Sequence, residues 1–284
     1  MTKATGGRPG APAIIGAMTG AGMLGGWLLG AGRGLLGALA GWWLVLFTGA
    51  QLMVLAFSPS SYRAQAGAGV LREIERAAAP GLPGFTVLMA LFNVVVIRIV
   101  VVTAFAYGLE PYAMDAVVRV LVLELIPLVA ALYVAVDYSI PGGSQLFKWR
   151  RAGGFERLRA QGQDPLAREV LPRVLGGVLA VSLLAAVSCV ISLLLTYVAV
   201  YGFTLAALPR YNRAVGHIFN PAVTLIFGLK TGLFALTVAL LPVANALRDI
   251  PRKRTRTSVE LQGLVQMFVL MLLIEMAALV GNYY

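Results

Sequence analysis

The chain has 284 residues, of which 59% are hydrophobic and 12% are charged, and its formal net charge is +11. Soluble domains of this size carry about a quarter charged residues, so the composition excludes an ordinary soluble protein. Apolar windows of about twenty residues can cross a bilayer as helices, and the period-two alternation of a membrane barrel is missing. The sequence therefore predicts an all-α, polytopic helical membrane protein. Its basic residues stand in short clusters between apolar segments, which favours membrane topology over nucleic-acid binding.

The N-terminal part of the chain is apolar and rich in glycine over residues 1–40. Its apolar run continues beyond Arg33, so it is too long for a typical cleaved signal peptide, and we expect it to lie in or dip into the membrane. Residues 41–57 are predicted to form an interfacial helix, with Trp42 and Trp43 at the level of the lipid headgroups.

Five longer apolar segments follow, and each is predicted to cross the membrane as a helix. The connections 58–80, 139–168 and 248–258 carry clusters of Lys and Arg, whereas 108–115 and 202–219 hold few. The positive-inside rule therefore places the three basic connections in the cytoplasm and the C-terminus outside. The predicted spans are residues 84–107, 116–137, 171–201, 220–247 and 259–282.

The tripeptide Asn220-Pro221-Ala222 is the signature of aquaporin-type water channels. Those channels need the motif twice, in two half-helices, whereas this chain contains it once and shows no internal repeat. At the start of a span, Asn is a good helix cap and Pro suits the first helical position. We therefore interpret the tripeptide as a helix start, and a channel is the less favoured function.

Signatures of catalysis are missing from the sequence. There is no Walker A pattern and no G-x-S-x-G motif, so we expect neither ATP hydrolysis nor lipid-enzyme chemistry in this chain. His217 is the sole histidine and has no Cys or carboxylate at ligand spacing, so no metal site is expected.

Four ionisable residues lie within predicted spans, where a charge is costly unless it is paired or faces a cavity. Arg98 and Glu124 stand at comparable depths in the first and second spans, and Lys230 and Glu275 in the fourth and fifth. We predict one ion pair from each couple. The alternative is that these side chains line a polar pathway and contact a lipid headgroup.

Four stretches and one single residue form an ordered set of motifs. They are Leu123-Glu124-Leu125-Ile126-Pro127, Asp164-Pro165-Leu166-x-Arg168-x-x-x-Pro172-Arg173-x-x-x-Gly177-Val178, Lys230-x-x-x-Phe234-Ala235-Leu236-Thr237-Val238, Arg252-x-x-Thr255-Arg256-Thr257-x-Val259, and Glu275. Together they resemble the MlaE (YrbE) family, the membrane subunits of MCE-type ABC lipid transporters. The family has R-E-L-G-P at the first motif and Asp at the last position. The resemblance covers residues 41–284, which we expect to form the permease domain.

The resemblance implies a function and a set of partners. It implies a permease subunit that moves phospholipid or another hydrophobic molecule in the bacterial inner (cytoplasmic) membrane. Partner ATPase subunits would hold ATP and Mg, and this chain would carry no cofactor. The other implied partners are an MCE-domain substrate-binding protein, a second permease copy or paralogue, and membrane lipids, but no nucleic acid.

The basic connection 139–168 would then be the cytoplasmic segment that couples the permease to the ATPase. We expect it to be partly helical and to be broken at Pro141-Gly142-Gly143. The alternative is an amphipathic helix that lies on anionic lipid headgroups. The candidate coupling residues are Phe147, Trp149, Arg150, Arg151, Phe155 and Asp164.

The chain departs from the family pattern in two regions that meet the ATPase in this family. The family's A-G-R-x-G reads Ala135-Val136-Asp137-Tyr138-Ser139 here, and the loop before the Thr-Arg run is shortened. Two hypotheses follow. The chain is a divergent half that pairs with a more typical permease, or it is a membrane scaffold that keeps the fold and does not transport.

Overall fold

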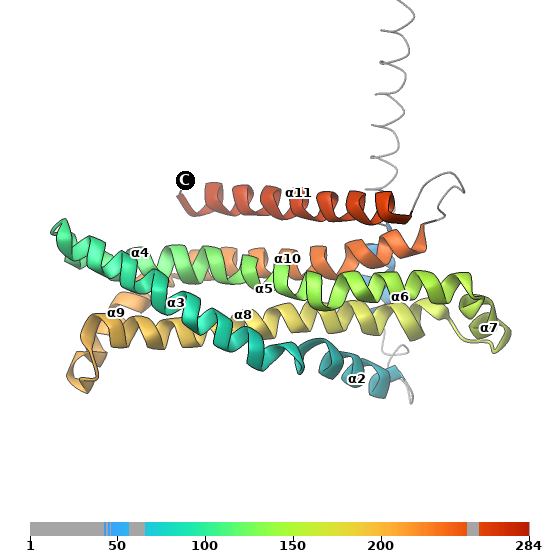
Figure 1. The fold of residues 1–284 in the computed structure, drawn as a ribbon, viewed down its shortest axis with the longest axis horizontal. Coiled ribbons are helices and arrows are strands. Elements are labelled where there is room, and N and C mark those ends of the chain that lie inside the picture. The colour runs from blue at the N-terminus through green and yellow to red at the C-terminus, as the bar shows by residue number, and fades with distance from the viewer. Residues whose placement is uncertain (1–42, 44, 46, 57–65, 249–255, 284) are drawn as a thin grey trace, which may run out of the picture. The chain divides into compact units, whose positions relative to one another are not determined.

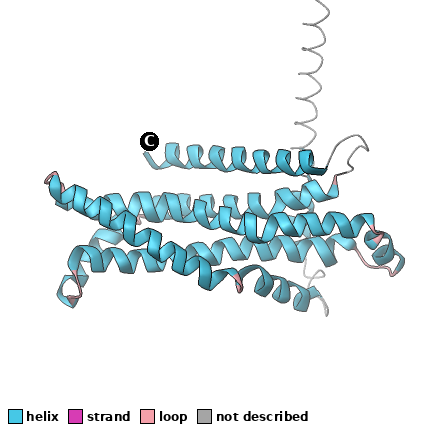
Figure 2. Cartoon of the chain, viewed as in Figure 1, coloured by secondary structure: helices cyan, strands magenta, loops and turns pink. Residues whose placement is uncertain are grey.

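The computed structural model forms two compact units, residues 1–47 and residues 48–284, and the second unit is described below. Every regular element of the described chain is a helix, which confirms the predicted all-α class (Figures 1 and 2). The predicted extension, residues 1–40, and most of the last basic connection lie outside the described residues. The structure describes residues 43, 45, 47–56, 66–248 and 256–283.

Five helical stretches of the described chain are long and apolar enough to cross a membrane, as predicted. A shorter apolar helix, Phe47–Ala56, lies where the interfacial helix was predicted. The chain is therefore a multi-pass membrane protein. The five stretches are Gly69–Ala106, Tyr112–Arg151, Leu166–Tyr201, Pro221–Leu247 and Gly263–Gly281.

The first of these stretches begins with an amphipathic helix. α2 (Ala66–Ala78) packs along α8 (Leu171–Tyr201) and leads through Pro80 into α3 (Gly81–Ala106). The Tyr138 hydroxyl donates a hydrogen bond to Glu73 Oε1 of α2 at 3.0 Å. The sequence predicted a polar connection here, and the structure shows that its second half is helical.

The second span is one continuous helix from Glu110 to Arg151. Pro127 and Pro141 lie within it, and each stands two residues after the end of a π-helical stretch, as does Pro172 at the start of α8. A proline has no N–H to donate, and its ring crowds the carbonyl four residues earlier, so the wider π turn relieves that contact. The elements are α4 (Glu110–Val117), η2 (Val118–Leu125), α5 (Ile126–Val134), η3 (Ala135–Ser139) and α6 (Ile140–Arg151), with η4 (Leu166–Val170) before α8.

The predicted break at Pro141-Gly142-Gly143 is wrong. The helix continues through these residues because η3 accommodates Pro141. The second span and α6, the first helix of the coupling segment, therefore form one continuous helix. The chain next turns at Gly153, whose φ of +80° lies in the left-handed region that glycine tolerates. α7 (Gly154–Ala160) follows this turn.

The connecting elements gather at the two ends of the spans (Figure 1). α4 and α9 (Leu208–Ile218) lie at one end, and α2, α6 and α7 lie at the opposite end. We call the second end the basic end because it holds a cluster of cations. They are Arg72, Arg76, Lys148, Arg150, Arg151, Arg157, Arg159 and Arg168.

The fourth span, α10 (Pro221–Leu247), packs against α8 and α11 (Arg256–Tyr283). α8 and α10 come close where a Cβ on Gly177 would lie 3.1 Å from the Cβ of Ala239. The glycine of the Gly177-Val178 motif thus permits a close helix contact.

The interpretation of Asn220-Pro221 as a helix start is confirmed. The Asn220 side chain accepts a hydrogen bond from the Val223 backbone N–H at 2.8 Å, and Pro221 is the first residue of α10. This single cap serves a full-length span, so the tripeptide plays an ordinary structural role.

We expect Asn220→Ala to lower the free energy of unfolding by about 1 kcal/mol, because it leaves an end N–H of α10 without its acceptor. Asn212→Ala, on the exposed face of α9, is the control and should change stability by less than about 0.5 kcal/mol. Thermal unfolding in lipid nanodiscs measures the difference, and equal melting of the two variants would contradict the capping role.

Candidate functional site

An ionic cluster in the spans has Lys230 at its centre. The Lys230 side chain on α10 is 1% exposed. Its Nζ donates to Glu275 Oε1 of α11 at 2.9 Å, to the Leu123 backbone oxygen at 3.2 Å, and to Glu124 Oε2 of η2. An ammonium group has three N–H donors, so all of them are used. Lys230 therefore ties the second and fifth spans to the fourth.

The motif around Glu124 explains why a backbone oxygen joins the cluster. In an α-helix the carbonyl of Leu123 would accept from the N–H four residues later, but that residue is Pro127, which has none. Lys230 Nζ donates to this same carbonyl. The Glu-x-x-Pro spacing thus removes the α-helical donor of a carbonyl that accepts from the same ammonium group as the Glu124 carboxylate.

The cluster contains more acceptors than Lys230 can satisfy. The Glu124 and Glu275 side chains are 15% and 16% exposed, and the buried Oε2 of Glu275 has no hydrogen-bond partner among the described residues. Lys230 Nζ also lies 5.9 Å from the centre of the Phe234 ring, within range of a cation–π contact. One buried cation therefore holds two partly buried carboxyl groups.

The predicted Arg98–Glu124 ion pair is wrong, because the structure pairs Glu124 with Lys230. Arg98 is exposed on α3, whose buried side includes Asn93, Ile97 and Val101. The sequence does not indicate that the side of α3 that carries Arg98 faces away from the second span. The other predicted couple, Lys230 and Glu275, does lie within hydrogen-bonding distance.

A second feature of interest lies at the basic end, where α6 is attached to the end of α10. Arg150 Nη1 donates to the backbone oxygens of Ala246 at 3.2 Å and Arg248 at 3.4 Å, and also to that of Leu247. The last carbonyls of a helix have no donors within the helix, and cations are favourable near them. Arg150 therefore binds the C-terminal end of α10.

α6 and α10 also meet at Gly143, one helical turn after residue 139, where the coupling segment begins. A Cβ on Gly143 would lie 2.8 Å from the backbone oxygen and 2.9 Å from the Cβ of Pro242, which is an interior proline of α10. Only glycine fits at this contact without a shift of one helix. We call Gly143, Arg150, Pro242 and the last turn of α10 the α6–α10 joint.

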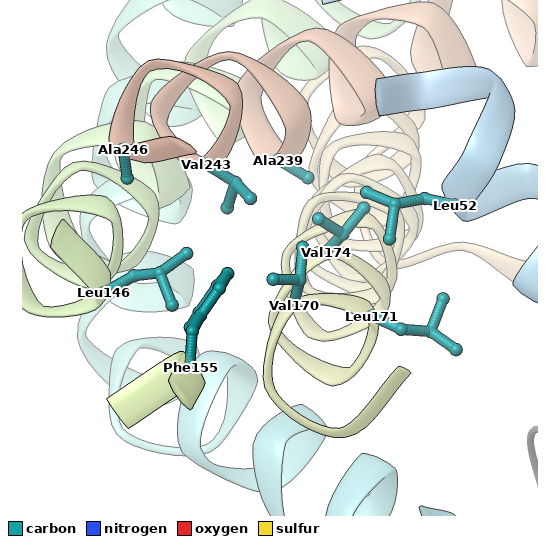
Figure 3. Packing of buried hydrophobic residues seen from close by; sticks show 9 residues of the cluster. All are labelled: Leu52, Leu146, Phe155, Val170, Leu171, Val174, Ala239, Val243 and Ala246. Atoms are coloured by element: carbon teal, nitrogen blue, oxygen red, sulfur yellow. The ribbon is translucent and has the colours of Figure 1, made fainter. Parts of the chain in front are cut away.

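The aromatic residues of the coupling segment pack inward. Phe155 is 8% exposed and points between Leu146 and Val170 (Figure 3). The Trp149 ring packs edge-on against Phe155, with 5.6 Å between the ring centres. Phe155, one of the candidate coupling residues, therefore belongs to the core of its own subunit.

The other predicted coupling residues have local contacts. Arg151 is exposed and stacks over the Phe147 ring, 5.6 Å from its centre. Asp164 Oδ1 accepts from the Leu166 N–H at 3.0 Å and shapes the start of η4. The exposed surface of the segment is therefore mostly charged.

Sequence reasoning missed the α6–α10 joint. One signal was present, since Pro242 lies within a predicted span, where proline is unfavourable without a packing reason, but Gly143 was assigned to a predicted break. Nothing in the sequence pairs these two positions, which are far apart along the chain. Their contact depends on the π-helical stretch that keeps α6 continuous with the second span.

A comparison with curated proteins gave no match. The sequence model of one protein family, described as "Permease MlaE", matches residues 70–280. This range includes Glu124, Lys230, Glu275 and the α6–α10 joint. This match extends over most of the chain and nearly the whole of the five spans. With its helical architecture and its motifs, the chain belongs to the MlaE permease family.

Proposed function

We propose that this chain is the permease subunit of an MCE-type ABC transporter that moves phospholipid or another hydrophobic molecule. The observation that carries the proposal is the family match over residues 70–280, which includes both the ionic cluster and the α6–α10 joint. ATP hydrolysis belongs to partner ATPase subunits, and an MCE-domain protein receives or supplies the substrate.

In this proposal the basic end faces the cytoplasm, because the connections there hold clustered cations. The ATPase binds the exposed charged surface of the coupling segment. Its closure moves α6, and Gly143 and Arg150 pass that movement to α10. α10 carries Lys230, so the same displacement reaches the contacts with the second and fifth spans.

A second permease copy or a paralogue completes the pathway in this proposal. α11 packs mainly against α10 and leaves an apolar side exposed within the described chain. Such a side needs either lipid or another apolar helix against it. Its exposed residues include Val265, Phe268, Leu272, Leu273, Met276 and Val280.

Reconstitution of the whole complex tests the proposal. We expect the full chain to co-purify with an ATPase and an MCE-domain protein, and proteoliposomes containing the complex to transfer a fluorescent phospholipid when ATP is added. The control is the same complex with an ATPase whose Walker A Lys is replaced. A purified assembly without an ATP-binding subunit would contradict the proposal. ATP hydrolysis without lipid transfer by any substrate tried would favour the scaffold hypothesis.

A further inference from the structure

Arg98 is an exposed cation in the middle part of a membrane span. It lies nine residues before Tyr107, which follows the end of α3, and this is about 13 Å along the helix. Nothing in the described part of the chain forms an ion pair or a side-chain hydrogen bond with it. A charge in such a position is unfavourable unless a polar group outside this subunit meets it.

The geometry of α3 limits the side chain's access to the nearer membrane surface. Side chains on a helix tilt toward its N-terminus, and Arg98 is closer to the C-terminal end of α3. Its Cα–Cβ bond therefore points toward the centre of the span. A lipid phosphate at the nearer surface would have to be drawn into the hydrocarbon layer to reach the guanidinium group.

Arg98 lies within an exposed apolar stripe of α3, which we call the Arg98 stripe. It consists of Leu91, Val94, Val95, Arg98, Val102 and Phe105.

A second copy of this chain is a poor occupant. A two-fold contact through the Arg98 stripe would bring the two Arg98 side chains toward one another. Glu124 and Glu275 bind Lys230, and Asp115 accepts from Arg119 at 2.8 Å. Asp137, the exposed carboxylate of the second span, lies 13 residues beyond Glu124 toward the basic end, away from Arg98. The missing anion must come from a different molecule.

We propose that the Arg98 stripe binds a transmembrane helix of another protein that carries an Asp or Glu at the depth of Arg98. The apolar side chains of the stripe pack along this helix, and the carboxylate neutralises the guanidinium group. The surface is separate from the Lys230 cluster and from the α6–α10 joint.

Site-specific photo-crosslinking in the native membrane tests this proposal on the full chain. A photoreactive amino acid is placed at Val102 in the Arg98 stripe, and at Val190 on the exposed side of α8 as the matched control. We expect the Val102 probe to crosslink to a transmembrane peptide that contains Asp or Glu, and the Val190 probe to give no such product. Mass spectrometry of the adduct identifies the peptide.

Substitution of Arg98 then tests the charge. Arg98→Leu should lower the yield of this adduct by about five- to tenfold, the scale of one polar contact between transmembrane helices, while Arg98→Lys should keep most of it. Leucine is more favourable than arginine within a span, so failure to insert would not explain the loss. The proposal is overturned if the probe crosslinks only to lipid, to a second copy of this chain, to a peptide without a carboxylate, or to nothing. An adduct yield that Arg98→Leu leaves unchanged would also overturn it.

Discussion

Lys230→Met is expected to lower the free energy of unfolding by about 3–5 kcal/mol, because it removes the single buried cation that holds two partly buried carboxyl groups. It also leaves the Leu123 carbonyl without the Lys230 donor. For a protein of this size the melting temperature should fall by about 6 °C or more. Thermal unfolding in lipid nanodiscs measures this change, and size-exclusion chromatography after heating gives the fraction of protein that is still folded.

The control for this prediction removes all three charges together. A combined Lys230→Met, Glu124→Gln and Glu275→Gln variant leaves no unpaired ion, so most of the lost stability should return. If the single and the triple variants melt alike, the loss reflects packing around the lysine chain and the ionic account is wrong. A melting temperature that Lys230→Met leaves unchanged would contradict the importance of the cluster altogether.

The positions of the spans followed from the sequence because they depend on local properties. Length and apolar content predicted five membrane helices, and α8 begins and ends at the predicted residues. The start of α10 was equally local, since a capping Asn and a following Pro act within one turn. Neither result required knowledge of what each helix touches.

The pairing of charges did not follow because it depends on how each helix is rotated. The sequence predicts comparable depths for Arg98 and Glu124, yet Arg98 faces outward, and the partner of Glu124 is Lys230 from a span much later in the chain. Depth can be counted along a sequence, whereas rotation is set by packing against several neighbours. The resemblance placed Lys230 and Glu275 at family positions but did not bring Glu124 into the same cluster.

The coupling segment shows the same limit for aromatic residues. A basic stretch containing Phe155 and Trp149 resembles a surface with apolar anchors, but these rings fill the space between α6, α7 and α8. The continuity of the second span is the cause. Since η3 lets the helix run through Pro141, α6 continues alongside the last turns of α10, and α7 follows the turn at Gly153 and packs against α6.

Gly143→Ala is expected to lower ATP-driven lipid transfer by about tenfold while the ATPase subunits still bind and hydrolyse ATP. The added Cβ would lie 2.8 Å from the Pro242 backbone oxygen, a contact that α6 and α10 can relieve only by moving apart. Overpacking of this kind costs about 1–3 kcal/mol, and a factor of ten in rate corresponds to about 1.4 kcal/mol. The ATPase-facing surface is unchanged, so hydrolysis should persist.

Gly142→Ala is the matched control for this prediction, because a Cβ at that neighbouring position has nothing within 4 Å. Both substitutions add one methyl group to the same turn of α6 and gain the same helix propensity, so they differ only in whether the methyl group meets α10. Transfer of a fluorescent phospholipid and phosphate release, measured on the same proteoliposomes, separate transport from hydrolysis. Equal transport by the two variants would show that the α6–α10 joint does not transmit the movement. A loss of hydrolysis specific to Gly143→Ala would instead place Gly143 in the binding of the ATPase.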